Sequence, residues 1–208
     1  MAFGKNVFIN CPFDEAFYNL LRPLLFTIVY LDLTPRIALE AMDSGKVRID
    51  RIVELIRESR YAIHDLSRMA ALNAGDLFRL NMPFELGIDL GARFFGQGEL
   101  NSKRCLVLEA EPYRYKAALS DLSGSDIAHH GNEPAKVVVV VRNWLRNTCK
   151  VAAPGPTLIW DSFNYFMADL HSDLLERGFS KTDVDALPIP ELIEQMTTWV
   201  AAQPSKVQ

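Results

Sequence analysis

Short apolar runs alternate with longer helix-like segments along the first 150 residues, and this alternation constrains the fold more than any other feature. The runs that we expect to form strands are Lys5–Ile9, Thr34–Leu39, Tyr61–His64 and Lys103–Glu109, with a brief edge strand at Asp126-Ile127. Strands that alternate with helices through short connections favour a parallel sheet covered by helices on both faces. The sequence therefore predicts an α/β fold with a short parallel sheet.

The clearest helix is expected over Val47–Ser59. Its apolar side chains recur at the i, i+3, i+4, i+7 spacing of one helical face, at Ile49, Ile52, Val53 and Ile56. Another helix is expected from Pro12 to about Tyr30. The segment Val137–Val141 is ambiguous, because its valines favour a strand. Pro134 is nevertheless typical of a helix start, and a helical stripe continues to Trp144, so we predict a helix there.

The segment Pro154-Gly155-Pro156 marks a boundary near the end of this pattern. We predict an α/β domain over residues 1–150 and a C-terminal helical extension over residues 151–208. Two helices are expected in the extension, at Thr157–Arg177 and Pro190–Ala202.

Composition excludes several classes of protein. The 208 residues carry a net charge of −4, which gives no general attraction to nucleic acid or to anionic membranes. No run of about 18 apolar residues is present, and the N-terminus lacks the apolar region of a signal peptide. The three cysteines are far apart and odd in number, as expected of reduced thiols. We therefore predict a cytoplasmic protein that binds neither membranes nor nucleic acid directly.

The stretch Asn81–Gly91 has the features of a helix start. Asn81 is a good N-cap, Pro83 lies where its missing N–H costs nothing, and Glu85 lies in or next to the first turn. Gly87 and Gly91 are costly in a helix, which indicates close packing or the close approach of a ligand.

Ligands of open α/β sheets bind outside the carboxyl ends of the strands. Here that edge collects polar and loop residues, namely Asn10, Pro12, Phe13, Asp43, Ser44, Gly45, His64, Asp65, Ser67, Asn81, Glu85, Asp126, His129 and His130. Each has a simpler alternative: Glu85 as an ordinary helix-start carboxylate, or Asp65 as a turn cap that acts through Ser67. The adjacent histidines 129 and 130 point apart and lack a third ligand at a suitable spacing, so we predict no metal site.

Two carboxylates at one edge suit chemistry at a sugar C1′ atom. Cleavage of an N-glycosidic bond builds an oxocarbenium-like centre, which one carboxylate stabilises or captures. A second group then helps the base to depart. Phosphate loops of the GxxxxGK[ST] type, GxGxxG segments and GxSxG elbows are all absent from the sequence.

Two segments resemble a known family. Val7–Phe13 (VFINCPF) is similar to the first strand and "PF" loop of nucleoside 2-deoxyribosyltransferases, and Asn81–Gly87 (NMPFELG) is similar to their GTxxE(I/L)G segment. The order of strand, Asp65, loop, Glu85 helix and strand matches as well. TIR domains that cleave NAD⁺ have the same layout, with a glutamate on the corresponding helix. The resemblance covers roughly residues 5–146.

The resemblance implies a flavodoxin-like three-layer domain in which Glu85 is the catalytic carboxylate. It also implies that Asp65 and the loop from Asn10 to Phe13 contact the sugar or the base. Position 79, where the transferases carry an aspartate, is Arg79, which favours hydrolysis over deoxyribosyl transfer. We therefore predict an N-glycosidase that cleaves the base–ribose bond of NAD or a related nucleotide without any cofactor.

The predicted site has two parts. Asp65 and Asp43 are expected to hold ribose hydroxyls, while free amides near Asn81 face a phosphate and nearby arginines supply positive charge. The predicted catalytic residues are Glu85 and Asp65. The predicted nucleotide-binding residues are Asn10, Pro12, Phe13, Asp43, Ser44, Gly45, His64 and Asn81.

Two other functions stay open. The first is a nucleotide-sensing or protein-interaction module without turnover, and the second, weaker one is transfer of a deoxyribosyl group between bases. The resemblance to TIR domains also implies a homo-oligomer. The aromatic residues that either form such an interface or pack in the core are Phe94, Phe95, Trp160, Phe163, Tyr165 and Phe166.

Overall fold

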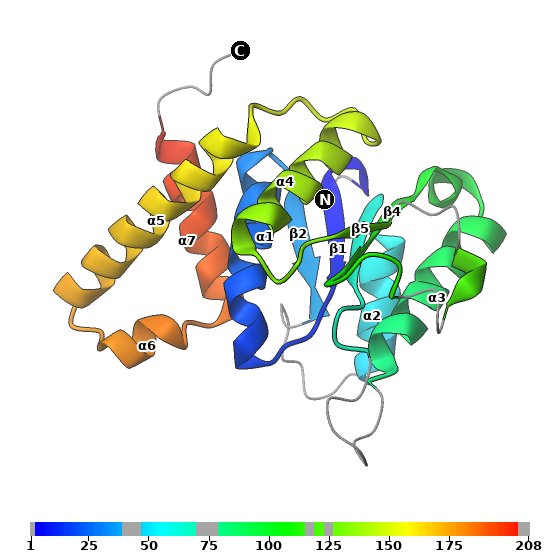
Figure 1. The fold of residues 1–208 in the computed structure, drawn as a ribbon, viewed down its shortest axis with the longest axis horizontal. Helices are drawn as coiled ribbons and strands as arrows, with labels where there is room; N and C mark the ends of the chain where they lie inside the picture. Colours follow the sequence, from blue (N-terminus) through cyan, green and yellow to red (C-terminus); the bar gives the residue numbers. More distant parts are fainter. Residues whose placement is uncertain (1–2, 39–46, 70–78, 115–118, 123–126, 204–208) are drawn as a thin grey trace.

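A five-stranded, fully parallel sheet forms the centre of the molecule (Figure 1). The computed structural model describes residues 3–38, 47–69, 79–114, 119–122 and 127–203. The strands are β1 (Asn6–Asn10), β2 (Thr34–Ile37), β3 (Tyr61–Asp65), β4 (Arg104–Glu109) and β5 (Ile127–His129), in the spatial order β2-β1-β3-β4-β5. The strand order reverses between β1 and β3, which is the switch point where ligands of such sheets bind.

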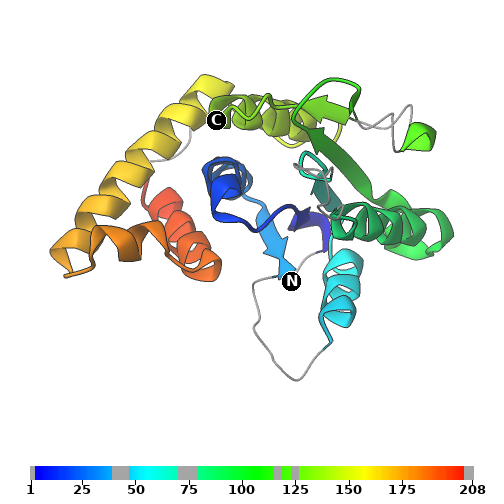
Figure 2. The same cartoon turned by 60° about the horizontal axis from the view of Figure 1, so that its bottom comes forward.

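Helices cover both faces of the sheet (Figure 2). On one face, α1 (Tyr18–Tyr30) and α4 (Pro134–Asn147) pack on the side chains of Val7 and Ile9. On the other face lie α2 (Arg48–Arg57) and α3 (Asn81–Phe95), and the intervening residue Phe8 packs against α2. This alternation along β1 is the two-residue period of a strand that is buried on both sides.

Most predicted elements are confirmed, and the valine-rich segment lies in α4, with Val137, Val138 and Val141 buried. The predicted start of the first helix is wrong. Pro12 does not open a helix, because a 3₁₀ turn at Glu15–Phe17 comes first and α1 begins at Tyr18. The amide of Phe17 donates to the carbonyl of Asp14 in this turn. The residues from Pro12 to Asp14 therefore stay in a loop at the carboxyl end of β1.

The C-terminal extension forms three helices, α5 (Pro156–Glu176), α6 (Lys181–Asp185) and α7 (Ile189–Ala202). Helices α5 and α7 share an apolar cluster with α1 and α4. At its centre, the ring of Phe26 lies 5.4 Å from that of Phe166 and 5.9 Å from that of Trp199. The protein is thus a flavodoxin-like three-layer α/β domain with a helical extension. The division at residue 150 stays a prediction, since one core spans both parts.

None of the helices in the described parts of the chain has the length and apolar character that spanning a bilayer requires.

Replacing Phe26 by leucine is expected to lower the free energy of unfolding by about 1–3 kcal/mol, because the ring is fully buried among aromatic neighbours. Urea denaturation measures the loss. Tyr165→Leu is the matched control, since that ring is 69 % exposed on α5, and we expect it to change stability by less than about 0.5 kcal/mol. Equal losses in the two variants would contradict the role given to Phe26.

Candidate functional site

A pocket of about 400 Å³ opens at the carboxyl end of β1, beside the switch point. Its walls come from the loop after β1, the first residue of α2 and the beginning of α3. The lining residues are Asn10, Cys11, Pro12, Phe13, Arg48, Arg79, Leu80, Asn81, Met82 and Glu85. The structure thus brings together five of the predicted site residues, which are Asn10, Pro12, Phe13, Asn81 and Glu85.

Helix α3 begins one residue earlier than its sequence predicts. Leu80 is the N-cap, its carbonyl accepts from the amide of Phe84, and no side chain caps the helix. The N-cap role predicted for Asn81 is therefore wrong, and Asn81 is an exposed first residue of the helix that lines the pocket. Glu85 lies beyond the first turn for the same reason.

The buried stripe of α3 contains two carboxylates. Met82, Glu85, Leu86 and Asp89 follow the i, i+3, i+4, i+7 spacing and are all buried, whereas Phe84 is 60 % exposed. Apart from the backbone of α3 itself and the adjacent residues, no described atom would lie within 4 Å of a Cβ at Gly87, so no other element packs closely there. The inward stripe places Glu85 against the pocket and Asp89 deeper, against His64 of the central strand β3.

Glu85 has an unusual environment for a carboxyl group. It is only 6 % exposed, it lines the pocket, and within the described residues no hydrogen bond reaches it. Burial raises its pKa to about 7, and the positive charge of Arg48 opposes that shift. Both protonation states of Glu85 are thus populated near neutral pH, as is typical of functional carboxyl groups.

Replacing Glu85 by glutamine is expected to stabilise the protein in a pH-dependent way. Because its pKa is higher in the folded than in the unfolded chain, folding stability falls as the pH rises from about 4.5 to about 7. Glutamine removes this loss, so the variant should gain about 1–3 kcal/mol at pH 8 and little at pH 4.5. Urea denaturation at both pH values measures the gain, and a gain independent of pH would contradict the raised pKa.

Asp65 lies next to the pocket but does not line it. Its Oδ1 accepts from the amide of Ser67 at 2.9 Å and from the Ser67 hydroxyl at 2.5 Å. Its Oδ2 lies 3.1 Å from Nε2 of His130, whose Nδ1 accepts from the amide of Asn132 at 3.0 Å. Asp65 is 1 % exposed; its Oδ1 closes the turn after β3, and its Oδ2 contacts His130. This arrangement corresponds to the alternative in which Asp65 caps a turn through Ser67. In addition, Asp65 contacts His130, which follows β5.

The remaining predicted site residues do not line the pocket in the described part of the chain. His64 is fully buried below the pocket, with Nε2 3.1 Å from Oδ2 of Asp89. The predicted contacts at Asp43, Ser44 and Gly45 lie outside the described residues.

Cys11 lines the pocket, but burial and the nearby carboxylates of Asp65 and Glu85 raise the pKa of its thiol. The thiol is therefore protonated and a poor nucleophile.

Arginines surround the pocket entrance. The guanidinium of Arg48 lies 5.9 Å from the centre of the Phe13 ring. Arg79 and Arg68 both pair with Asp14, at 2.6 Å and 2.8 Å. This pairing of two arginines with Asp14 is called the Asp14 clamp below, and the sequence did not reveal it because its members are 54 and 65 residues apart. The Asp14 clamp holds Arg79 at the pocket wall.

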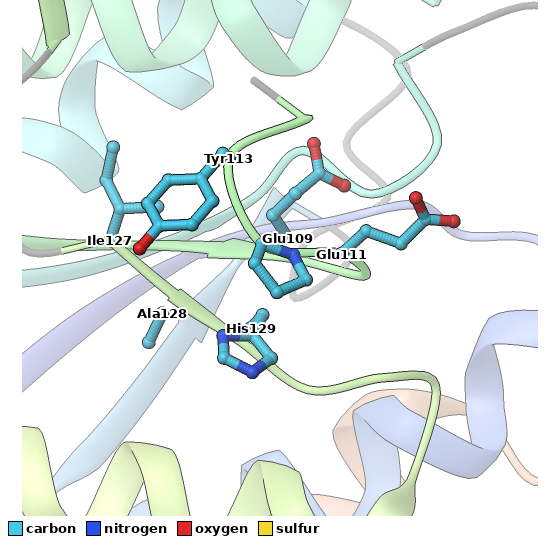
Figure 3. Close-up of a pocket in the computed structure, with 7 residues that line it drawn as sticks. Glu109, Glu111, Tyr113, Ile127, Ala128 and His129 are labelled. Atoms are coloured by element: carbon cyan, nitrogen blue, oxygen red, sulfur yellow. The ribbon is translucent and has the colours of Figure 1, made fainter. Parts of the chain in front are cut away.

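A second cavity of about 190 Å³ lies at the carboxyl ends of β4 and β5 (Figure 3). Tyr113 and Ile127 lie on one side of it, and the carboxylates of Glu109 and Glu111 lie on the other. His129 faces this cavity, whereas His130 turns away to Asp65. Glu109 is buried and accepts from the amide of Ala110. Burial raises the pKa of Glu109.

Among the described residues, one group offers three atoms at metal-binding distance, namely His64, Asp89 and Cys105. The ammonium of Lys103 lies 2.9 Å from Asp89 and already supplies positive charge there. This group therefore gives no support to a metal site. That the protein has no metal site stays a prediction.

Comparison of the chain with protein-family models, curated proteins and solved structures found no match.

Proposed function

We propose that the protein is an N-glycosidase that cleaves the base–ribose bond of NAD or a related nucleotide, in the manner of TIR-like and nucleoside 2-deoxyribosyltransferase-like proteins. The observation that carries the proposal is the setting of Glu85, a buried carboxyl group that faces a pocket at the switch point and receives no hydrogen bond from the described residues. Such a group is available to a ligand, and its raised pKa is typical of active sites.

In this reaction the bond between C1′ and the base nitrogen breaks, and its electron pair leaves with the base. The carboxylate of Glu85 stabilises the resulting ribosyl cation or captures it as an ester. A water oxygen then bonds to C1′ and loses a proton to the solvent, and where the ester has formed its bond to C1′ breaks and the Glu85 carboxylate is regenerated. The nicotinamide of NAD⁺ departs as a neutral molecule, so this substrate needs no general acid.

The pocket supports a phosphorylated substrate. Arg48 and Arg79 line it, and it borders the N-terminal ends of both α2 and α3. The N-cap residues of these helices, Val47 and Leu80, have apolar side chains that make no cap hydrogen bond, so the first amides and the positive dipole ends favour an anion. Phe13 and Pro12 provide an apolar wall for a base or sugar face. The volume of about 400 Å³ lies within the range of small-molecule sites.

The proposal is tested by incubating the protein, at low and high concentration, with NAD⁺ and a panel of nucleotides and nucleosides. Released base is measured by chromatography. Release from NAD⁺ or a nucleotide, and not from the matching nucleoside, is the expected result. No release from any of them, at any protein concentration, would overturn the proposal.

The pH dependence of kcat/KM is expected to reveal the role of Glu85. If its carboxylate stabilises the cation, kcat/KM rises as the pH rises through about 7, because the ionised fraction increases. We expect this slope for NAD⁺. A fall over the same range would instead make Glu85 the acid that protonates a leaving base. A profile flat between pH 5.5 and 8.5 would contradict both roles.

A non-catalytic module is a second candidate, supported by one observation. Phe84, Phe94 and Phe95 on α3 are 60 %, 67 % and 88 % exposed, which is unusual for phenylalanine. Such a surface favours assembly into a homo-oligomer. Thermal stabilisation by a nucleotide without product, together with a concentration-dependent mass in solution, would support this function over turnover.

A further inference from the structure

A chain of buried polar side chains runs from the pocket along the buried face of α3. The Asn10 side-chain amide donates to the carbonyl of Met82 at 2.8 Å and lies 3.0 Å from Nδ1 of His64. Nε2 of His64 lies 3.1 Å from Oδ2 of Asp89, and Oδ1 of Asp89 lies 2.9 Å from Nζ of Lys103. These four side chains, Asn10, His64, Asp89 and Lys103, are called the polar chain below, and each is at most 3 % exposed.

The hydrogen-bond pattern assigns every proton in the polar chain. A backbone carbonyl only accepts, so the amide nitrogen of Asn10, and not its oxygen, must face Met82. The same nitrogen directs its other hydrogen at Nδ1 of His64, which must therefore be unprotonated. The His64 proton is then on Nε2 and is donated to Asp89.

The far end of the polar chain is fixed by charge. Burial raises the pKa of Asp89, but the hydrogen bond from His64 and the charge of Lys103 outweigh burial and lower the pKa overall. Lys103 also donates to the carbonyls of Ile56 and Ser59 at the end of α2. An ionised Asp89 accepts from His64, and this bond sets the tautomer that Asn10 requires.

Met82 lies in the first turn of α3, three residues before Glu85. Both Met82 and Glu85 belong to the buried stripe of the helix. The Asn10 hydrogen bond therefore ties the uncapped first turn of α3 to the end of β1, which forms the opposite wall of the pocket. This hydrogen bond restrains the helix that carries Glu85, about one turn away from the Glu85 carboxyl group.

We propose that Asn10 is a positioning residue, which holds Glu85 toward the pocket through the Met82 carbonyl and is itself oriented by His64, Asp89 and Lys103. This inference rests on the proposed function for its catalytic consequence. Its structural part, the fixed tautomer of His64 and the tie to α3, stands on the hydrogen bonds alone.

The test compares Asn10→Leu with a control on the same strand. Asn6 is 1 % exposed at the opposite end of β1, and its amide donates to the carbonyl of Glu58 at 2.8 Å. Asn6→Leu thus removes an equivalent buried hydrogen bond away from the pocket. We expect both variants to lose similar thermal stability. Only Asn10→Leu should lower kcat, by about tenfold or more, with KM changed less than threefold.

The decisive readout is the pH midpoint of kcat/KM. Glu85 is expected to become more hydrated in Asn10→Leu, so the midpoint moves by about one unit toward the ordinary glutamate pKa. The groups that interact electrostatically with Glu85, the Arg48 guanidinium on α2 and the neutral Cys11 thiol after β1, are the same in both variants. Loss of stability alone does not move this midpoint. An unchanged midpoint and kcat, or a higher KM at constant kcat, would overturn the proposal.

Two measurements need no substrate and separate this inference from the proposed function. In ¹⁵N NMR spectra of the unmodified protein at pH 7, Nδ1 of His64 should be unprotonated and Nε2 protonated. The stabilisation by Glu85→Gln at pH 8 should also shrink when Asn10→Leu is already present. A protonated Nδ1, or an undiminished gain, would overturn the inference even if the enzyme is active. If no base is released by the unmodified protein, the proposed function fails and these two results still decide the positioning role.

Discussion

Glu85→Gln is expected to abolish base release while leaving the fold intact. Glutamine has nearly the same shape but carries no charge, so it neither stabilises a ribosyl cation nor forms an ester with C1′. Glu85 receives no hydrogen bond from the described residues, so the substitution breaks no hydrogen bond among them. We expect kcat to fall about 1,000-fold or more, which corresponds to about 4 kcal/mol of transition-state stabilisation.

Glu99→Gln is the matched control, because Glu99 is an exposed glutamate in the 3₁₀ segment that follows α3. It should retain full activity. Circular dichroism and the denaturation midpoint confirm that Glu85→Gln is folded. Activity of the folded Glu85→Gln variant within a factor of a few of the unmodified protein would remove Glu85 from the mechanism and favour the non-catalytic module.

The fold of the chain was predictable because its signals are local. Each strand is a short apolar run, and the stripe in Val47–Ser59 gives α2 directly. The valine run of α4 is instructive, since its propensity favours a strand while Pro134 and the position of Trp144 favour a helix. The segment is a helix because burying its apolar stripe against the sheet contributes more free energy to folding than the small preference of valine for a strand.

The site was predictable only in part, because its decisive contacts are between distant residues. The edge rule for parallel sheets correctly gathered Asn10, Phe13, Asn81 and Glu85 around one pocket. It could not show that Asp65 is shared between Ser67 and His130, since His130 lies 65 residues further along the chain. The Asp14 clamp with Arg68 and Arg79 likewise depends on contacts across the sheet edge.

The sequence also did not show that the side of α3 with Glu85 and Asp89 faces the sheet. Periodicity separates Glu85 and Asp89 from Phe84, but it does not say which side faces the sheet. The partners that make a buried Asp89 tolerable, His64 and Lys103, come from β3 and from the residue before β4. A buried lysine next to a strand is a weak signal in a sequence, because lysine is usually exposed.

Lys103→Met is expected to cost about 3–5 kcal/mol of folding stability. The ammonium group is 1 % exposed, lies 2.9 Å from Asp89 and donates to the carbonyls of Ile56 and Ser59. Methionine fills similar space but leaves the buried carboxylate with His64 alone and leaves two carbonyls without this donor. An uncompensated buried charge accounts for most of the expected loss.

The double variant Asp89→Asn, Lys103→Met separates charge from packing. Because it removes both ions, it should be more stable than the sum of the two single losses predicts, by about 2–3 kcal/mol. Lys5→Met is the control, since Lys5 pairs with Asp32 at 2.5 Å but both side chains are largely exposed, and it should cost less than about 1 kcal/mol. Urea denaturation at pH 7 gives all four values. Strict additivity of the single losses would mean that Lys103 and Asp89 stabilise the fold independently, and that the ion pair between them does not hold the polar side of α3 against the sheet.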